Sequence, residues 1–264
     1  MEIDVAASAG QHWARTMPAR LARELLICGV FGAIINTYAR REVIGREHLD
    51  HLEGPVIFVA NHCSHVDTPA LLRSLPSRWR RRTAVAAAAD YFYRKRLLAT
   101  AVSLAFGTVP LERRGGGMAT DVTAHLQDLI DRSWSLVLFA EGTRSRDGRV
   151  GRMRSGAAML AAEHGLPIVP IHICGTREAM PTGRHWMVRP KGGGRWARHR
   201  ITLSFGDPIH VGGREDRLEV MERVRLFMEL CGADTTPDPK LALRRAAVAA
   251  RAAQESRAGA GQHV

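Results

Sequence analysis

Two residues that could carry acid–base chemistry, His62 and Asp67, stand five positions apart in Asn61-His62-Cys63-Ser64-His65-Val66-Asp67. An apolar run, 56–60, precedes this segment, and Thr68-Pro69 follows it, so that Thr68 is expected to cap a helix that begins at Pro69. In one continuous helix, the two side chains would face directions about 140° apart. In a turn, Asp67 can instead accept a hydrogen bond from one ring nitrogen of His62, which leaves the other nitrogen as a base.

Such a dyad is suited to activating a hydroxyl of the substrate rather than a nucleophile of the enzyme. Cys63 and Ser64 are the rival nucleophiles, but residues next to His62 in the chain cannot readily aim at the same atom. Direct transfer is therefore favoured over a covalent intermediate. On its own, His62 could also be a turn histidine that satisfies backbone groups.

Three further segments add to the candidate site. Glu141, Gly142, Thr143 and Arg144 follow the predicted strand 135–139, and ligands bind at the carboxyl ends of strands in open α/β sheets. Arg144 offers a planar fork that matches a phosphate, Gly142 permits close backbone approach, and Glu141 could orient the arginine or a hydroxyl. Segment 107–114 contributes Gly107, Arg113 and Arg114, and segment 168–171 contributes an apolar wall that contains Val169 and Pro170.

Together the four segments resemble the PlsC-type glycerolphosphate and lysophosphatidate acyltransferase superfamily over roughly residues 43–210. The family's first block, Asn-His-x-Ser-x-x-Asp, is matched by Asn61, His62, Ser64 and Asp67, and the order and separation of all four blocks agree. Ala140 departs from the proline that the family usually has before its glutamate.

The resemblance implies an enzyme, a 1-acylglycerol-3-phosphate O-acyltransferase of phospholipid synthesis. It implies that His62 deprotonates the acceptor hydroxyl, that Asp67 orients His62, and that the hydroxyl attacks a thioester. The donor would be acyl-CoA or acyl carrier protein, used as a substrate rather than as a bound cofactor. The acceptor would be a lipid whose phosphate is held by Arg144 and Arg113, with Glu141 and Gly142 shaping that pocket.

Composition limits the class of protein and its partners. The chain has 264 residues and a formal charge of +12, which predicts an anionic partner such as a phosphorylated substrate or a membrane surface. Aromatic residues make up only 6%, so the stacking surfaces of nucleic-acid binders are poorly supplied, and no nucleic-acid partner is expected. No metal site is predicted, because the four scattered cysteines and the remaining histidines lack ligand spacing. These histidines include His65, His125, His164, His172 and His199.

Apolar runs that alternate with helical patterns predict an α/β fold with a mostly parallel central sheet flanked by helices. The expected strands are 56–60, 84–88, 135–139, 168–173 and 201–205, and the expected helices are 68–75, 118–130, 155–164 and a segment past Glu215. Three domains are predicted, namely an N-terminal helical segment (1–42), the acyltransferase domain (43–236) and an Ala/Arg-rich helix and tail (237–264).

The first domain is expected to associate with membranes. Its apolar stretch between Pro18 and Arg41 is bracketed by Arg15, Arg20, Arg23, Arg40 and Arg41, an arrangement typical of a helix lying on an anionic interface. Residues 91–106 are a second candidate for membrane contact. No secretory signal and no membrane-spanning helix are expected, so the protein is predicted on the cytoplasmic side of the membrane, as a peripheral or monotopic protein.

Three alternatives stay open. The first is an acyltransferase that acts on a different lipid or alcohol acceptor. The second is a hydrolase in which the same dyad activates water. The third is a non-enzymatic basic membrane-binding module, in which the turn from His62 to Asp67 is structural.

Overall fold

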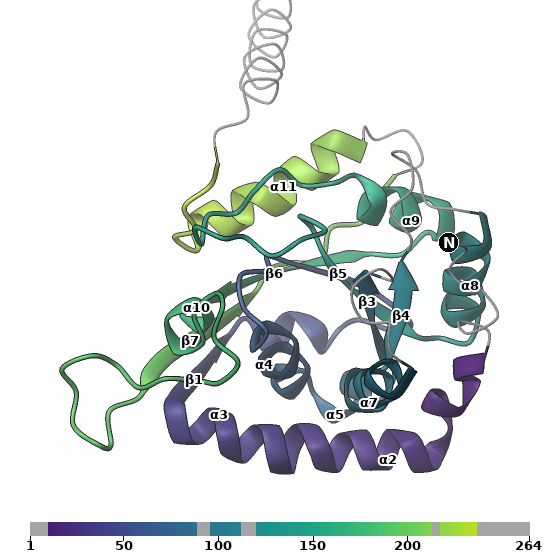
Figure 1. The fold of residues 1–264 in the computed structure, drawn as a ribbon. Coiled ribbons are helices and arrows are strands. Elements are labelled where there is room, and N and C mark those ends of the chain that lie inside the picture. Colours follow the sequence, from purple (N-terminus) through teal and green to yellow (C-terminus); the bar gives the residue numbers. More distant parts are fainter. Residues whose placement is uncertain (1–9, 89–95, 112–119, 213–216, 237–264) are drawn as a thin grey trace, which may run out of the picture. The chain divides into compact units, whose positions relative to one another are not determined.

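A seven-stranded sheet organises the chain, with the strand order β1-β7-β6-β2-β5-β3-β4 (Figure 1). The computed structural model describes residues 10–88, 96–111, 120–212 and 217–236. The strands are β1 (Ala39–Ile44), β2 (Ile57–Ala60), β3 (Thr83–Ala88), β4 (Thr108–Leu111), β5 (Ser135–Phe139), β6 (Ile168–Cys174) and β7 (His199–Phe205). The predicted α/β fold with a mostly parallel sheet is confirmed.

The sheet contains one reversal of direction. β6, β2, β5, β3 and β4 are parallel to one another, whereas β7 pairs antiparallel with β6, and β1 then pairs parallel with β7. The amino ends of β1 and β7 therefore lie at the same edge of the sheet as the carboxyl ends of β2, β5 and β6.

Apolar side chains cover both faces of the central strands, which is why these strands are continuous hydrophobic runs in the sequence. In β2, Ile57 and Val59 belong to one buried core, and Phe58 and Ala60 belong to the other. Successive side chains of a strand point to opposite faces, so one short strand contributes to two cores.

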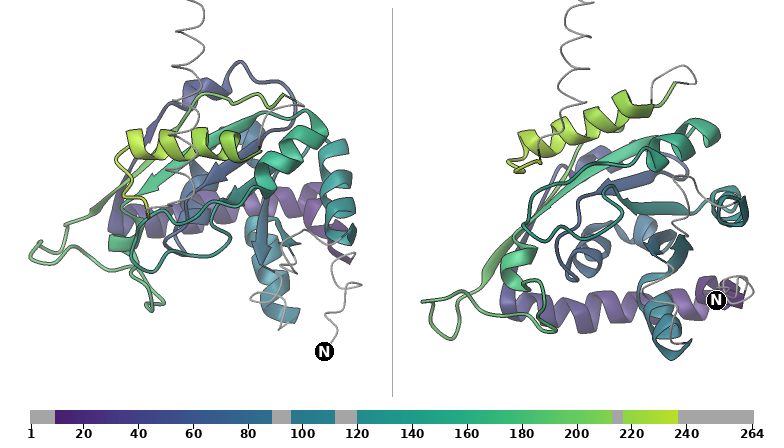
Figure 2. Two further views of the ribbon diagram at one scale, coloured as in Figure 1. Left: turned by 90° about the horizontal axis from the view of Figure 1, so that it is seen from above. Right: turned by 45° about the horizontal axis from the view of Figure 1, so that its top comes forward.

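Helices form a layer on each side of the sheet (Figures 1 and 2). The first core includes residues of α8 (Thr120–Asp131), α9 (Gly156–His164) and α11 (Arg217–Leu230). The second includes residues of η2 (Leu26–Phe31), α3 (Gly32–Tyr38), α4 (Asp67–Ser74), α5 (Ser77–Arg80) and α10 (Thr176–Ala179). Other described helices are η1 (Gly10–Arg15), η3 (Arg46–Leu49) and α7 (Arg96–Phe106).

The N-terminal helical run consists of α2 (Met17–Leu25), η2 and α3, and it ends at Tyr38 rather than at Arg41. Residues 39–42 belong to β1, since they pair with β7. Two of the bracketing arginines are committed to the interior. Arg23 is 2% exposed and donates hydrogen bonds to the carbonyls of Ala14, Ser103 and Leu104. Burial lowers the pKa of Arg23 to about 10 and that of the half-buried Arg41 likewise to about 10.

Among the described residues, no helix combines the length and the apolar character that crossing a bilayer requires. Residues 1–234 and 235–264 are two separate units by their contacts. The predicted C-terminal helix and tail, 237–264, lie outside the described residues, as do residues 91–95 of the second candidate for membrane contact.

Candidate active site

The turn after β2 carries His62, and α4 begins at Asp67, one residue before the predicted cap Thr68. Val66 holds the N-cap position and makes no side-chain capping bond. The turn is closed instead by Asp67, whose Oδ2 accepts hydrogen bonds from the backbone N–H groups of Cys63 (2.7 Å) and Ser64 (2.8 Å). The prediction of a Thr68 cap is therefore wrong, because a carboxylate in the first turn already satisfies the preceding backbone.

The same carboxylate oxygen holds His62. Its Oδ2 lies 2.8 Å from Nδ1 of His62, and the Asp67 side chain is fully buried. An ionised carboxylate can only accept, so Nδ1 carries the proton and Nε2 keeps a lone pair. Within the described residues, Nε2 has no hydrogen-bond partner, and the His62 side chain is 18% exposed. The turn thus presents a basic nitrogen to an accessible space.

Thr176, the first residue of α10, completes the surroundings of Asp67. Its hydroxyl donates a hydrogen bond to Oδ1 of Asp67, although 109 positions separate the two residues. Thr176 is fully buried. Sequence reasoning did not select this residue, and its place directly after β6 is the only local signal that it could reach the site.

Phe139 and Ser145 hold the remainder of His62 in place. The ring of Phe139, the last residue of β5, stacks on the imidazole with centroids 4.0 Å apart and planes inclined by 19°. The backbone N–H of Ser145 donates to the His62 carbonyl over 2.7 Å. The ring orientation is thereby set by packing as well as by Asp67.

Glu141 joins this turn to a second loop through its two carboxylate oxygens. Oε1 accepts the backbone N–H of His62 (3.1 Å), and Oε2 accepts that of Gly151 (2.9 Å). Burial raises the pKa of Glu141. In the structure Glu141 therefore supports the backbone, whereas the sequence suggested that it orients Arg144 or a substrate hydroxyl.

Asn61 and Ser64 also position the turn rather than facing an open pocket. The Asn61 amide spans to β6, donating to the carbonyl of Ile173 over 2.9 Å and accepting its N–H over 2.7 Å. Ser64 donates from Oγ to the carbonyl of Met180 over 3.0 Å. Both side chains are buried.

Arg144 lies beside His65, the exposed histidine of the same turn. Its Nη1 donates a hydrogen bond to Nε2 of His65, which requires a neutral imidazole. Partial desolvation of the imidazole, followed by the charge of the adjacent Arg144, lowers the pKa of His65 to about 4. Thr143 is exposed next to Arg144, and Gly142 adopts a φ of 69° that favours glycine. His65, for which the sequence predicts no role and no metal-ligand spacing, thus contacts Arg144.

Three other predicted residues lie elsewhere. Gly107 precedes β4, at the opposite edge of the sheet from His62, where a side chain in its place would meet the guanidinium of Arg23. It takes no part in the pocket, because the parallel strands carry their amino ends away from the site. Val169 and Pro170 lie within β6 and are buried in the sheet. Arg113 lies outside the described residues.

Cys63 is an unsuitable nucleophile in this setting. Burial, followed by the charge of Asp67, raises the pKa of its thiol to about 12. Its Sγ lies 3.3 Å from the hydroxyl of Thr176. The thiol is therefore protonated at neutral pH and packs against the dyad.

Several known proteins are similar to this chain in sequence or in fold. Residues 40–174 match the acyltransferase family. The chain is 33% identical over 151 residues to the chloroplastic 1-acyl-sn-glycerol-3-phosphate acyltransferase BAT2 of Brassica napus, which covers 56% of this chain and 41% of that protein. It is 30% identical over 199 residues to the corresponding chloroplastic LPAT1 of Arabidopsis thaliana, which covers 74% of this chain and 51% of that protein.

The chain thus spans about half the length of these relatives, 41% and 51%. The crystal structure of the 1-acyl-sn-glycerophosphate acyltransferase PlsC from Thermotoga maritima superimposes with a TM-score of 0.61 at 21% identity, over 86% of this chain and 85% of that one. This likeness concerns the fold. With the matched residues and the four sequence blocks, it follows that the chain belongs to the acyltransferase family of the PlsC type.

Proposed function

We propose that the protein transfers a fatty acyl group from a thioester donor, acyl-CoA or acyl carrier protein, to a hydroxyl of a lysophosphatidate-like acceptor. The product would be a phospholipid precursor. The observation that carries this proposal is the 2.8 Å contact between Nδ1 of His62 and the buried Asp67 carboxylate, which leaves Nε2 as the basic atom. The names of the chloroplastic relatives support the choice of acceptor.

In the proposed reaction, Nε2 of His62 takes the proton of the acceptor hydroxyl as its oxygen attacks the thioester carbonyl. The tetrahedral intermediate collapses with cleavage of the carbon–sulfur bond, and the thiolate receives the proton from His62. Asp67 stays ionised throughout and stabilises the imidazolium that forms between the two steps. The protonated Cys63 supports direct transfer, because no other thiol or hydroxyl of the turn is placed to be acylated.

Arg144 is proposed to bind the acceptor phosphate, together with Arg113. Its planar guanidinium matches a phosphate oxygen pair, and it follows β5 at the edge where His62 also lies. Gly142 and Thr143 would border the same phosphate, while Glu141 would keep the two loops at a fixed separation.

The reaction is proposed to take place at the cytoplasmic surface of an anionic membrane. Every fourth residue of α2 is an exposed apolar side chain: Met17 (60% exposed), Leu21 (50%) and Leu25 (74%). Val30 in η2 is 53% exposed. One side of a helix is formed by residues four apart, so these side chains would enter the interfacial region together.

The test measures free thiol released from palmitoyl-CoA with and without lysophosphatidate, for the native chain and His62→Ala. Acceptor-dependent release that is lost in the variant is the expected result. His48→Ala is the matched control, since Nδ1 of His48 also contacts an aspartate, Asp207, at 2.6 Å in a different part of the sheet. It should retain activity.

Release without acceptor would identify a thioesterase and contradict the proposal. If palmitoyl-CoA is not used, the same comparison is made with palmitoyl acyl carrier protein. Absence of release from both donors would contradict it as well, and would favour the binding module.

A further inference from the structure

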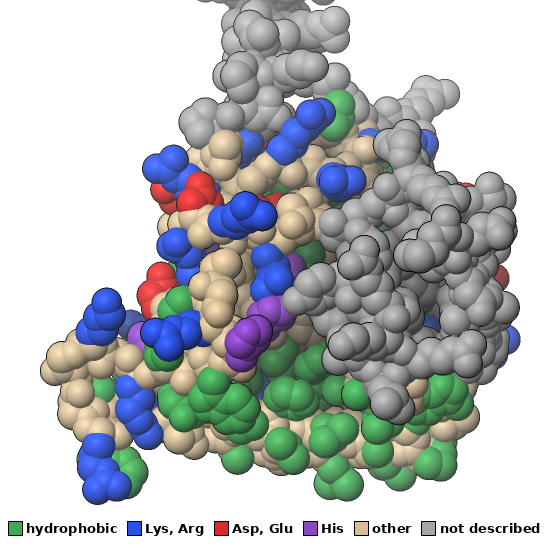
Figure 3. Space-filling model, in the orientation of Figure 1, with side chains coloured by type: hydrophobic (Ala, Val, Ile, Leu, Met, Phe, Trp, Pro, Cys, Tyr) green, Lys and Arg blue, Asp and Glu red, His purple; other side chains and the backbone are tan. Residues whose placement is uncertain are grey.

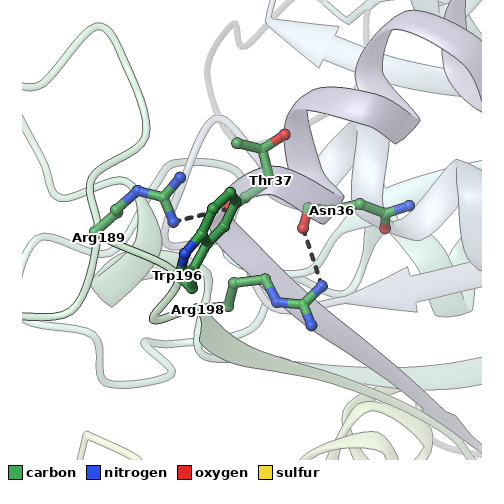
Figure 4. A pocket seen from close by; sticks show the side chains of 5 residues that line it. All are labelled: Asn36, Thr37, Arg189, Trp196 and Arg198. Atoms are coloured by element: carbon green, nitrogen blue, oxygen red, sulfur yellow. Dashed lines mark hydrogen bonds between the residues drawn. The ribbon is translucent and has the colours of Figure 1, made fainter. Parts of the chain in front are cut away.

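A pocket of about 340 Å³ lies where the end of α3 meets the long loop between α10 and β7. Figure 4 shows the five side chains that line it, which are Asn36, Thr37, Arg189, Trp196 and Arg198. The pocket is separate from the turn that holds His62.

Two arginines of the pocket are anchored through a single nitrogen each. Nη1 of Arg189 donates to the carbonyls of Thr37 (3.3 Å) and Ala197 (3.2 Å), and Nη1 of Arg198 donates to that of Asn36 (3.3 Å). In the part of the chain that the structure describes, neither guanidinium pairs with a carboxylate. A guanidinium carries five N–H donors, so each arginine retains donors and a full charge that suit an anion.

Capping of α3 accounts for only part of this arrangement. Carbonyl groups at the end of a helix attract a cation, and one basic side chain suffices for that purpose. Here two guanidinium groups donate to carbonyls of the same helix end, and Arg189 also lies 5.4 Å from the ring centroid of Tyr38. The positive charge that results is not balanced within the described pocket.

Two exposed tryptophans accompany these arginines on the loop. Trp196 is 77% exposed and Trp186 is 58% exposed. Trp186 donates from Nε1 to the hydroxyl of Tyr38 over 3.1 Å, and Arg195 lies 5.1 Å from the ring of Trp196. Tryptophan with a polar anchor beside arginine is typical of the headgroup level of a bilayer.

The pocket continues the apolar side of the N-terminal helical run. Its residues Asn36 and Thr37 stand one turn beyond η2 on the same continuous helix as Leu21 and Leu25. Figure 3 shows hydrophobic side chains along the lower border of the molecule, over α2 and α3, and basic side chains on the loop beside them. Apolar contact and anion binding are therefore available side by side.

We propose that the pocket binds the phosphate headgroup of an anionic membrane phospholipid, apart from the acceptor lipid at Arg144. Arg189 and Arg198 would hold the phosphate, and Trp196 would lie against the glycerol backbone. This inference rests on the membrane-surface part of the proposed function. Because β7 is reversed, the loop reaches the same edge of the sheet as His62, so a lipid bound here would hold the bilayer close to the active site.

The test compares sedimentation of the full chain with vesicles of phosphatidylcholine alone and of phosphatidylcholine mixed with phosphatidylglycerol. The double variant Arg189→Gln with Arg198→Gln keeps an amide donor for the helix carbonyls but removes both charges. Its affinity for the vesicles that contain phosphatidylglycerol should fall about tenfold or more. Trp196→Ala should weaken binding to the same mixed vesicles while the arginines remain.

Arg46→Gln with Arg132→Gln is the control, because both residues are exposed and lie at the opposite edge of the sheet. It removes the same charge and should change the affinity by less than about threefold. An equal loss of vesicle affinity in both double variants would mean that binding depends on the overall charge of the protein, and it would contradict a lipid site in this pocket. Inorganic phosphate or CoA could also displace the native chain from vesicles more strongly than sodium chloride at equal ionic strength. This result would show that the pocket binds a soluble phosphate, and it would contradict the proposal of a lipid ligand.

The two proposals are separated by thiol release with a short-chain lysophosphatidate below its micelle concentration. The Arg189→Gln, Arg198→Gln variant should react at the native rate in this assay and unfold at the native temperature. Loss of this activity together with vesicle binding would show that the arginines serve the fold or the acceptor site, which would overturn the inference while leaving His62 as the base.

Discussion

Arg144 donates a hydrogen bond to His65, and this contact joins the loop after β5 to the turn that contains His62. The bond exists only while His65 is neutral, because a protonated imidazole has no acceptor nitrogen. The pKa of His65, lowered to about 4, keeps the ring neutral at physiological pH. His65 is thus a positioning residue for the arginine that is proposed to bind phosphate.

Replacing His65 by Leu should raise the KM for the acceptor about three- to tenfold, the range expected for losing one hydrogen bond to a charged group. The value of kcat should change little, because His62 and Asp67 stay in place. His65→Gln offers an acceptor oxygen at similar reach and should restore much of the lost affinity. Steady-state kinetics with varied lysophosphatidate decide this, and an unchanged KM in His65→Leu would contradict the assigned role.

The lowered pKa of His65 also predicts a pH dependence of stability. The folded value of about 4 lies below the ordinary 6.5, so between these pH values the unfolded chain binds a proton that the folded chain excludes. The contribution of neutral His65 to the free energy of unfolding is fully present above pH 6.5 and is lost as the pH falls toward 4. Urea unfolding across this range should show a smaller loss of stability for His65→Gln than for the native chain. Parallel curves would argue against a titrating His65.

Thr176→Val should lower both stability and turnover. The valine leaves Oδ1 of the buried Asp67 without its hydroxyl donor, at a cost of about 1–3 kcal/mol in the free energy of unfolding. Less firmly held, Asp67 should orient His62 less well, and kcat should fall about tenfold, part of what general-base catalysis contributes. Thr176→Ser keeps the hydroxyl and is the matched control. Native kcat in Thr176→Val would show that Asp67 needs no support from α10.

Cys63→Ala should retain kcat to within about threefold, since a thiol that is protonated at neutral pH is a poor nucleophile. Alkylation offers an independent check, because Cys28 is exposed whereas Cys63 is buried and has a pKa raised to about 12. Iodoacetamide at neutral pH should modify Cys28 first, as peptide mass analysis would show. An acyl group trapped on Cys63 during turnover would require a covalent route.

The sequence predicted strands where apolar residues are concentrated. The segments 56–60, 84–88, 135–139, 168–173 and 201–205 are of this kind, and they overlap β2, β3, β5, β6 and β7. β1 escaped prediction because its sequence is rich in charged residues and it pairs only with β7 at the edge of the sheet. β4 escaped because it contains Pro110 and follows an apolar helix with a single residue between them.

At the site, the sequence predicted a contact within one turn but not the contacts between residues that are far apart in the chain. His62 and Asp67 were predicted as partners because five residues in one turn place them together. Thr176 and the stacked ring of Phe139 come from other strand ends, and no spacing in the sequence reports their contact. His65 escaped because a single histidine has no pattern, and only the fold brings Arg144 to it.

Because β7 runs antiparallel to β6, the loop that precedes it can change independently of the catalytic residues. The long loop before β7 reaches the rim of the site without interrupting the turn of His62, the loop of Arg144 or the start of α10. Its length and composition can therefore drift while the chemistry is conserved. A chimaera in which residues 181–198 are replaced by the corresponding segment of a relative should keep the native rate on a dissolved acceptor. Its relative affinity for vesicles of different lipid composition should become that of the relative.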